Sequence, residues 1–186
     1  MNDSQALSQE DLFSTYASAS ALAEANAFRT VPTNYYKAVG VKHDAKLSGP
    51  TEQFPNGRVI INARVELSRE DKKAGSISMF LSPAVGRTKT GKLDREFRLY
   101  NQLVRALYPE ITNEAEFAGI STGALLERFT QYPVGMFVTE TFASEPDGIS
   151  GAKTYLDAKT DAEAAELRKK GWKANNYVQS VGKFKS

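Results

Sequence analysis

The chain has 186 residues, 41% of them hydrophobic, which is enough for one folded domain with an appendage. It contains no cysteine, which excludes disulfide bonds, thiolate metal sites and cysteine nucleophiles and fits a reducing compartment. The net charge of +2 excludes a polycation. No apolar run is long enough to span a membrane, and the first residues are too polar and acidic for a signal peptide, so we expect a cytoplasmic protein.

Charge is distributed unevenly along the chain. Residues 1–28 contain four acidic residues and no Lys or Arg, whereas residues 151–186 contain eight basic and four acidic residues. Residues 1–28 are rich in Ala and Ser, and a short helix over residues 9–27 would have only a thin apolar stripe to stabilise it. We therefore predict an acidic N-terminal tail or arm over residues 1–28. A single domain over residues 29–186 follows, with a basic C-terminal segment that suits a polyanionic partner.

The first predicted strand covers residues 30–41. Val31-Pro32 sets an extended entry, and Gly40 is expected to mark a bulge or a sharp bend. Residues 43–57 are expected to form a loop. This loop holds His43, the only histidine, for which the sequence offers no metal-binding partner.

The clearest β pattern in the chain follows the turn dipeptide Asn56-Gly57. Apolar residues alternate with polar ones over residues 59–67 and again over residues 76–81, and the charged segment 68–75 between them predicts an antiparallel hairpin. One face of this hairpin belongs to a core. The residues of the other face are Arg58, Asn62, Arg64, Ser78 and Phe80. A positive face with an aromatic residue suits a nucleic-acid groove, although a solvated face with one exposed Phe explains the same pattern.

A basic loop follows the hairpin at residues 82–92. Arg87, Lys89 and Lys92 alternate there with threonines and glycines, so the loop could contact phosphates, or it could be an ordinary basic surface loop. Its glycine spacing does not match a P-loop.

Helices are predicted after this loop. Asp94 is expected to be the N-cap of a helix that ends at Leu107 and packs its apolar stripe, including Phe97 and Tyr100, into the core. Two shorter helices are predicted over residues 113–118 and 122–131, and the second should pack Leu125, Leu126 and Phe129.

The C-terminal third is predicted to contain two strands and one helix. A strand over residues 136–142 precedes a long loop, 143–160. Thr160 and Glu163 form a capping box for a helix over 161–170, and Gly171 is its C′ residue. The last strand, 172–184, should place Tyr177 and Val181 on one side and Val178 on the other.

Five strands with helices inserted late in the chain predict a mostly β, α+β protein. The economical architecture is a small five-stranded, partly open OB-like barrel with a helix between its strands.

We expect no enzyme, cofactor or metal site, because the one histidine has no catalytic partner at a recognisable spacing and no carboxylates cluster as in two-metal nucleases. A glycosidase-type carboxylate pair has no local signature and is not tested by the sequence.

Six segments carry a family resemblance. VPTNYYKAVGV, GRVIINARVEL, GSISMFLSP, LDREFRLYNQLVRALY, LLERFTQYPVGMFVTETF and NNYVQSVGKF resemble, in element order over residues 30–184, the phage-encoded OB-fold single-stranded DNA-binding proteins. The resemblance implies sequence-tolerant binding of single-stranded DNA in replication or recombination, in the host cytoplasm, by phosphate pairing and base stacking. Replication or recombination proteins and a second copy of the chain are further partners that it suggests.

The resemblance assigns DNA binding to ten residues. They are Tyr36, Lys42, Arg58, Arg64, Phe80, Arg87, Lys89, Lys92, Trp172 and Tyr177. For each aromatic residue in this set, core packing is the competing interpretation. The chain departs from the family in one respect, because such proteins often end in an acidic tail, whereas here the acidic residues are N-terminal and the C-terminus is basic.

Two other functions fit the same pattern. A structural or virion assembly protein could use residues 1–28 as an arm for subunit contacts. An OB-type module could instead bind a protein or inhibit a host enzyme.

Overall fold

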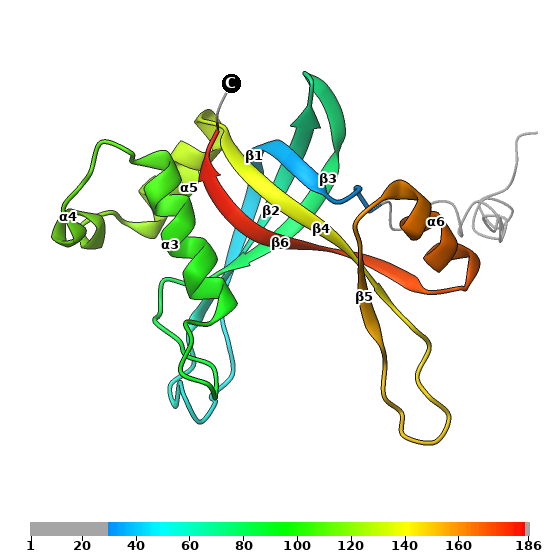
Figure 1. Ribbon diagram of the computed structural model, residues 1–186. Helices are drawn as coiled ribbons and strands as arrows, with labels where there is room; N and C mark the ends of the chain where they lie inside the picture. The colour runs from blue at the N-terminus through cyan, green and yellow to red at the C-terminus, as the bar shows by residue number, and fades with distance from the viewer. Residues whose placement is uncertain (1–29, 185–186) are drawn as a thin grey trace, which may run out of the picture.

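The structure, a computed structural model, describes residues 30–184, so the predicted arm over residues 1–28 lies outside the described residues (Figure 1). The strands are β1 (Asn34–Leu47), β2 (Val59–Arg69), β3 (Lys72–Leu81), β4 (Val134–Ala143), β5 (Tyr155–Ala158) and β6 (Lys173–Lys183). The helices are α3 (Arg95–Leu107), α4 (Glu114–Ala118), α5 (Thr122–Gln131) and α6 (Asp161–Lys169). The described chain is therefore mostly β, as the sequence predicted.

The six strands form one open antiparallel sheet. β1, β2 and β3 follow one another as a meander, and β4 then pairs with the N-terminal half of β1. β5 pairs with the second half of β4, and β6 pairs with β4 along its whole length. β1 and β5 therefore share one edge of β4, and β6 occupies the other edge.

Helix α3 covers the free edge of β6. The Arg95 guanidinium donates to the carbonyl oxygen of Val178 at 3.2 Å, and the backbone N–H of Val181 donates to Gln102 Oε1 at 3.0 Å. α3 also packs against β3, so it lies between the two edge strands of the sheet (Figure 1). This placement satisfies backbone groups of an edge strand that would otherwise be open to pairing with another chain.

The main core lies between the inner face of the sheet and helices α3 and α5. Most of the alternating residues of the predicted hairpin are buried as expected: Ile61, Ala63, Val65, Leu67, Ile77, Met79 and Leu81. Val59, at the start of β2, was predicted with them but is 41% exposed. Leu125, Leu126 and Phe129 of α5 are buried too, which confirms that prediction. A smaller cluster forms where α6 packs Ala164 and Leu167 against Phe142 of β4.

The predicted helix caps are confirmed. Asp94 accepts a hydrogen bond from the backbone N–H of Phe97 at 2.9 Å, and Thr160 accepts one from the N–H of Glu163 at 3.2 Å. Gly171 ends α6 with a left-handed φ of 76°, and the N–H of Trp172 donates to the Leu167 carbonyl, which is the hydrogen bond of a Schellman motif. These signals are local in sequence, so they did not depend on the tertiary fold.

The predicted first strand was too short, and its expected bulge is confirmed. β1 continues to Leu47, so His43 lies in a strand and not in a loop. The register with β2 shifts between Gly40 and Lys42. Beyond this bulge both faces of β1 are exposed, and alternating burial no longer marks the strand in the sequence.

Three other strand predictions need correction. The loop 68–75 shrinks to the two-residue turn Glu70-Asp71, because the polar ends of β2 and β3 continue to pair beyond the core. The loop 143–160 contains β5, a four-residue edge strand, which makes six strands where five were predicted. On β6, Val178 and Val181 are both buried, because a register shift opposite Phe137 interrupts the alternation.

The close contact at Gly40 makes a prediction about stability. A Cβ atom added to Gly40 would lie 2.8 Å from Cδ1 of the buried Phe129 ring. Gly40→Ala should therefore lower the free energy of unfolding by about 1–3 kcal/mol, measured by urea denaturation, because the ring has no free space to move into. Gly49→Ala, which meets nothing within 4 Å, is the matched control, and an equal loss in both variants would contradict the prediction.

Candidate nucleic-acid interface

The outer face of the β1–β2–β3 meander brings together residues from three strands. We call it the β1–β3 face. Lys42, Arg64 and Ser78 form one cross-strand row. The other rows are Asp44, Asn62 and Phe80, and then Lys46 and Ile60. The next row holds Glu66, opposite Val39 and Ser76, and its carboxylate is paired with Lys73. With Lys73 counted, four cations and two carboxylates share this face, which gives it a positive charge.

Phe80 is the aromatic residue of this face. Its side chain is 49% exposed, although it follows directly on the buried Met79 in a strand whose inner residues belong to the core. Arg64 is exposed one row away on the neighbouring strand. An exposed ring beside a guanidinium that points to solvent provides a stacking surface and a phosphate contact at adjacent positions.

Arg58 does not belong to this exposed surface. Its guanidinium pairs with the Asp94 carboxylate and, at 3.4 Å, with Glu96, and it stacks 4.7 Å from the centre of the Phe54 ring. The predicted phosphate contact is therefore corrected, because two carboxylates already neutralise this cation. Arg58 instead holds the loop before β2 against the loop before α3.

The basic loop lies beside this ion-paired cluster and is a narrow turn. The N–H of Thr88 donates to the Lys92 carbonyl at 2.7 Å, and Arg87 donates from Nη1 to the Gly91 carbonyl at 2.8 Å. Lys89 and Lys92 are exposed at its tip. Arg87 therefore shapes the turn, and the two lysines are its cations directed to solvent.

Two predicted aromatic residues are packed against other side chains. Tyr36 is 3% exposed, its hydroxyl donates to the Pro32 carbonyl at 2.6 Å, and burial raises its pKa above the ordinary value. Trp172 is half-buried against the cluster beneath α6. The prediction for Tyr36 is wrong, because its ring is buried in the core. Trp172 follows the helix-capping motif and packs one side against this cluster, and its base stacking stays a prediction.

Tyr177 occupies a separate surface. It lies on β6 opposite Thr139, and the Arg95 guanidinium lies 4.7 Å from the centre of its ring. Burial lowers the pKa of Arg95 from its ordinary value, although an arginine remains charged at neutral pH. The structure therefore does not bring Tyr177 onto the β1–β3 face.

The sequence interpretation missed Asp44 and Lys46. Both lie on the outer side of β1 beyond the bulge, in a segment that was predicted to be loop. The alternation of the charged residues Lys42, Asp44 and Lys46 could have indicated a strand. The residues between them are exposed as well, so the segment lacks the buried apolar face by which strands are recognised.

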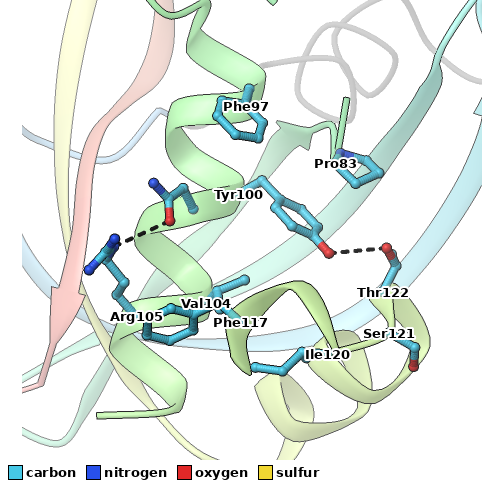
Figure 2. Close-up of a pocket in the computed structure, with 10 residues that line it drawn as sticks. Pro83, Phe97, Tyr100, Val104, Arg105, Phe117, Ile120, Ser121 and Thr122 are labelled. Carbon is cyan, nitrogen blue, oxygen red and sulfur yellow. Dashed lines mark hydrogen bonds between the residues drawn. The ribbon is translucent and has the colours of Figure 1, made fainter. Parts of the chain in front are cut away.

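A pocket of about 550 Å³ lies between α3 and α4 (Figure 2). Phe97, Tyr100 and Phe117 line it, and the Tyr100 hydroxyl forms a 3.1 Å hydrogen bond with that of Thr122. Phe97 and Tyr100 were predicted to lie in the core. Tyr100 packs against the core and is half-buried, whereas Phe97 is half-buried at the pocket, and Leu99 takes the fully inward position.

No protein-family model matches this sequence, and comparisons with curated proteins and with solved structures give no match either. Over residues 30–184, no helix has the length and apolar character to cross a membrane. In the same range, no three His, Cys, Asp or Glu side chains are grouped as a metal site. His43 is exposed on β1, opposite Ala63.

The role of Arg58 can be tested by stability. Arg58→Ala should lower the free energy of unfolding by about 1–3 kcal/mol, because it leaves the largely buried Asp94 carboxylate without its cation. Arg64→Ala, at an exposed position of β2, should change it by about 0.5 kcal/mol or less. Chemical denaturation of both variants checks this, and equal losses would show that Arg58 is not a structural cation.

Proposed function

We propose that the protein binds single-stranded DNA without sequence preference and without catalysis, through the β1–β3 face. The observation that carries this proposal is the exposed pair of Arg64 and Phe80 within a positive three-stranded surface. Every base has a π-face, so stacking on an exposed ring tolerates any sequence, and phosphate pairing supplies the remaining affinity.

The fold proposed for this function is an OB-like barrel. Supporting it, the chain forms a three-stranded meander, then helices, and then a strand that returns to pair with β1 and is followed by its own partner, β6. α3 contacts both edge strands, β3 and β6, as a helix that closes a small barrel would. Such barrels bind oligonucleotides across their second and third strands, which correspond here to β2 and β3.

The basic loop adds phosphate contacts at one end of this face in the proposal. The Arg58 cluster holds the loop beside the start of β2, so Lys89 and Lys92 can reach a backbone that leaves the sheet there. In the cell, this role belongs to phage replication or recombination in the host cytoplasm, where proteins of those processes and further copies of the chain would be partners.

Binding can be tested by fluorescence anisotropy with a labelled oligo-dT and a matching duplex. We expect salt-sensitive binding that favours the single strand. Phe80→Ala should weaken it by about fivefold or more, because loss of one stacked base costs about 1–3 kcal/mol. Tyr132→Ala, which removes an equally exposed ring at the end of α5, is the control. Absence of binding at low salt would refute the proposal and favour the assembly or protein-binding functions.

The salt dependence tests the loop separately. The double variant Lys89→Ala, Lys92→Ala should reduce the slope of log K against log salt concentration by about 1.4, because each phosphate contact on a single strand contributes about 0.7. The same substitutions at Lys72 and Lys73, exposed at the opposite end of β3, should leave the slope unchanged. Equal slopes in the wild type and the loop variant would exclude the loop from the interface.

A further inference from the structure

The outer face of β4 carries a row of aromatic side chains, three of them exposed and one, Tyr177, half-buried. The inner residues of β4, such as Met136 and Val138, belong to the core, and Phe137 and Ala143 lie on the opposite side. Neighbouring strands place four rings on this outer side. They are Tyr35 on β1, Phe137 on β4, Tyr177 on β6 and Tyr155 on β5. We call this surface the β4 face.

Tyr35 is held across the sheet by a glycine. A Cβ atom on Gly135 would lie 1.4 Å from the Tyr35 hydroxyl oxygen and 2.3 Å from Cζ, so the ring lies directly on the backbone of Gly135. The hydroxyl donates to the Lys183 carbonyl at 3.3 Å. The side chain nevertheless stays 43% exposed. One side of the ring therefore rests on the Gly135 backbone, and the other side is open to solvent.

The other rings continue along β4 from this point. Phe137 is directly opposite Tyr35 and is 38% exposed. Tyr177 is opposite Thr139, and Tyr155, 60% exposed, is opposite Ala143. A shallow groove of about 650 Å³ lies between the two tyrosines, over the small side chains of β4.

The register fixes the spacing of these rings. Phe137 and the partner of Tyr177 are two residues apart on β4, and the partner of Tyr155 is four residues further. At about 3.3 Å per residue these steps are about 7 Å and 13 Å. Tyr177 and Tyr155 lie on strands at opposite edges of β4, so the rings are further apart than these steps along β4. Such separation suits bases that are unstacked from one another and stacked on protein instead.

Cations accompany the rings. Lys37 lies opposite Gly135, Arg95 stacks on Tyr177, and Lys173 lies opposite Ala143. Two carboxylates are also present: Glu145, 3.5 Å from Lys173, and Asp157, which accepts a hydrogen bond from Thr141. Rings separated by small residues and flanked by cations match a stacking track for a polyanion better than a continuous apolar patch for a protein.

β1 joins this face to the β1–β3 face. Its outer side presents Lys37 before the bulge and Lys42 and Lys46 after it. β1 therefore carries a line of lysines from the β4 face to Arg64. The phosphate backbone of a bound DNA strand can follow this line.

We propose that the β4 face is a second section of the binding surface for single-stranded DNA. A single DNA strand would run from the β1–β3 face along β4 and pass over Tyr35, Phe137, Tyr177 and Tyr155. This inference rests on the proposed function and adds the path and the length of the bound segment.

The experiment compares oligo-dT of about 6 and about 20 nucleotides, lengths that bracket the site sizes of OB folds. For the wild type we expect a large gain in affinity with length. The double variant Phe137→Ala, Tyr155→Ala should lose about tenfold or more of the affinity for the long oligonucleotide, so that most of the gain with length disappears. Tyr155 is exposed on an edge strand, so Tyr155→Ala alone serves if the double variant fails to fold.

A glycine pair supplies a matched control for the Tyr35 ring. Gly135→Ala displaces the ring and should weaken binding of the long oligonucleotide, whereas Gly182→Ala, directly opposite on β6 with nothing within 4 Å, should not. If the variants of the β4 face keep the full gain with length, this inference is wrong even though the protein binds DNA. That result would favour a protein partner on the face. If the wild type binds neither oligonucleotide, the proposed function fails as well.

Discussion

The bulge of β1 at Gly40 constrains how the two halves of the sheet are joined. Phe129 of α5 lies so close to this glycine that no side chain fits between them, and the register with β2 shifts immediately afterwards. Before the bend β1 pairs with both β2 and β4, and beyond it β1 pairs with β2 alone. One strand therefore joins the meander to the C-terminal half of the sheet, and α5 packs against it at the bulge.

The same bulge lies between the two proposed binding surfaces. β1 turns its outer side from the β4 face toward the β1–β3 face, so its lysines pass from one aromatic surface to the other. The inner side of the sheet is occupied by core residues and by α3 and α5, which leaves the outer side for a ligand. Two paired carboxylates meanwhile hold Arg58 in place, so the basic loop stays at one end of this outer surface.

The candidate site was only partly predictable because exposure depends on the whole fold. Arg64 and Phe80 were identified correctly as outer-face residues, since strand alternation alone places them opposite a buried face. Tyr36 and Arg58 were also predicted to bind DNA from their places in alternating segments. Tyr36, however, is buried, and Arg58 is paired with carboxylates distant in the sequence. No property of their neighbours in the sequence distinguishes these cases.

The local features could be predicted from the amino-acid sequence because each depends on residues a few positions apart: the buried hairpin face, the helix caps at Asp94 and Thr160, and the bulge at Gly40. The length of β1, the existence of β5 and the burial of both Val178 and Val181 became known from the three-dimensional structure. These depend on strand pairing across the sheet. Pairing supplies hydrogen bonds to polar or exposed segments that have no hydrophobic pattern of their own.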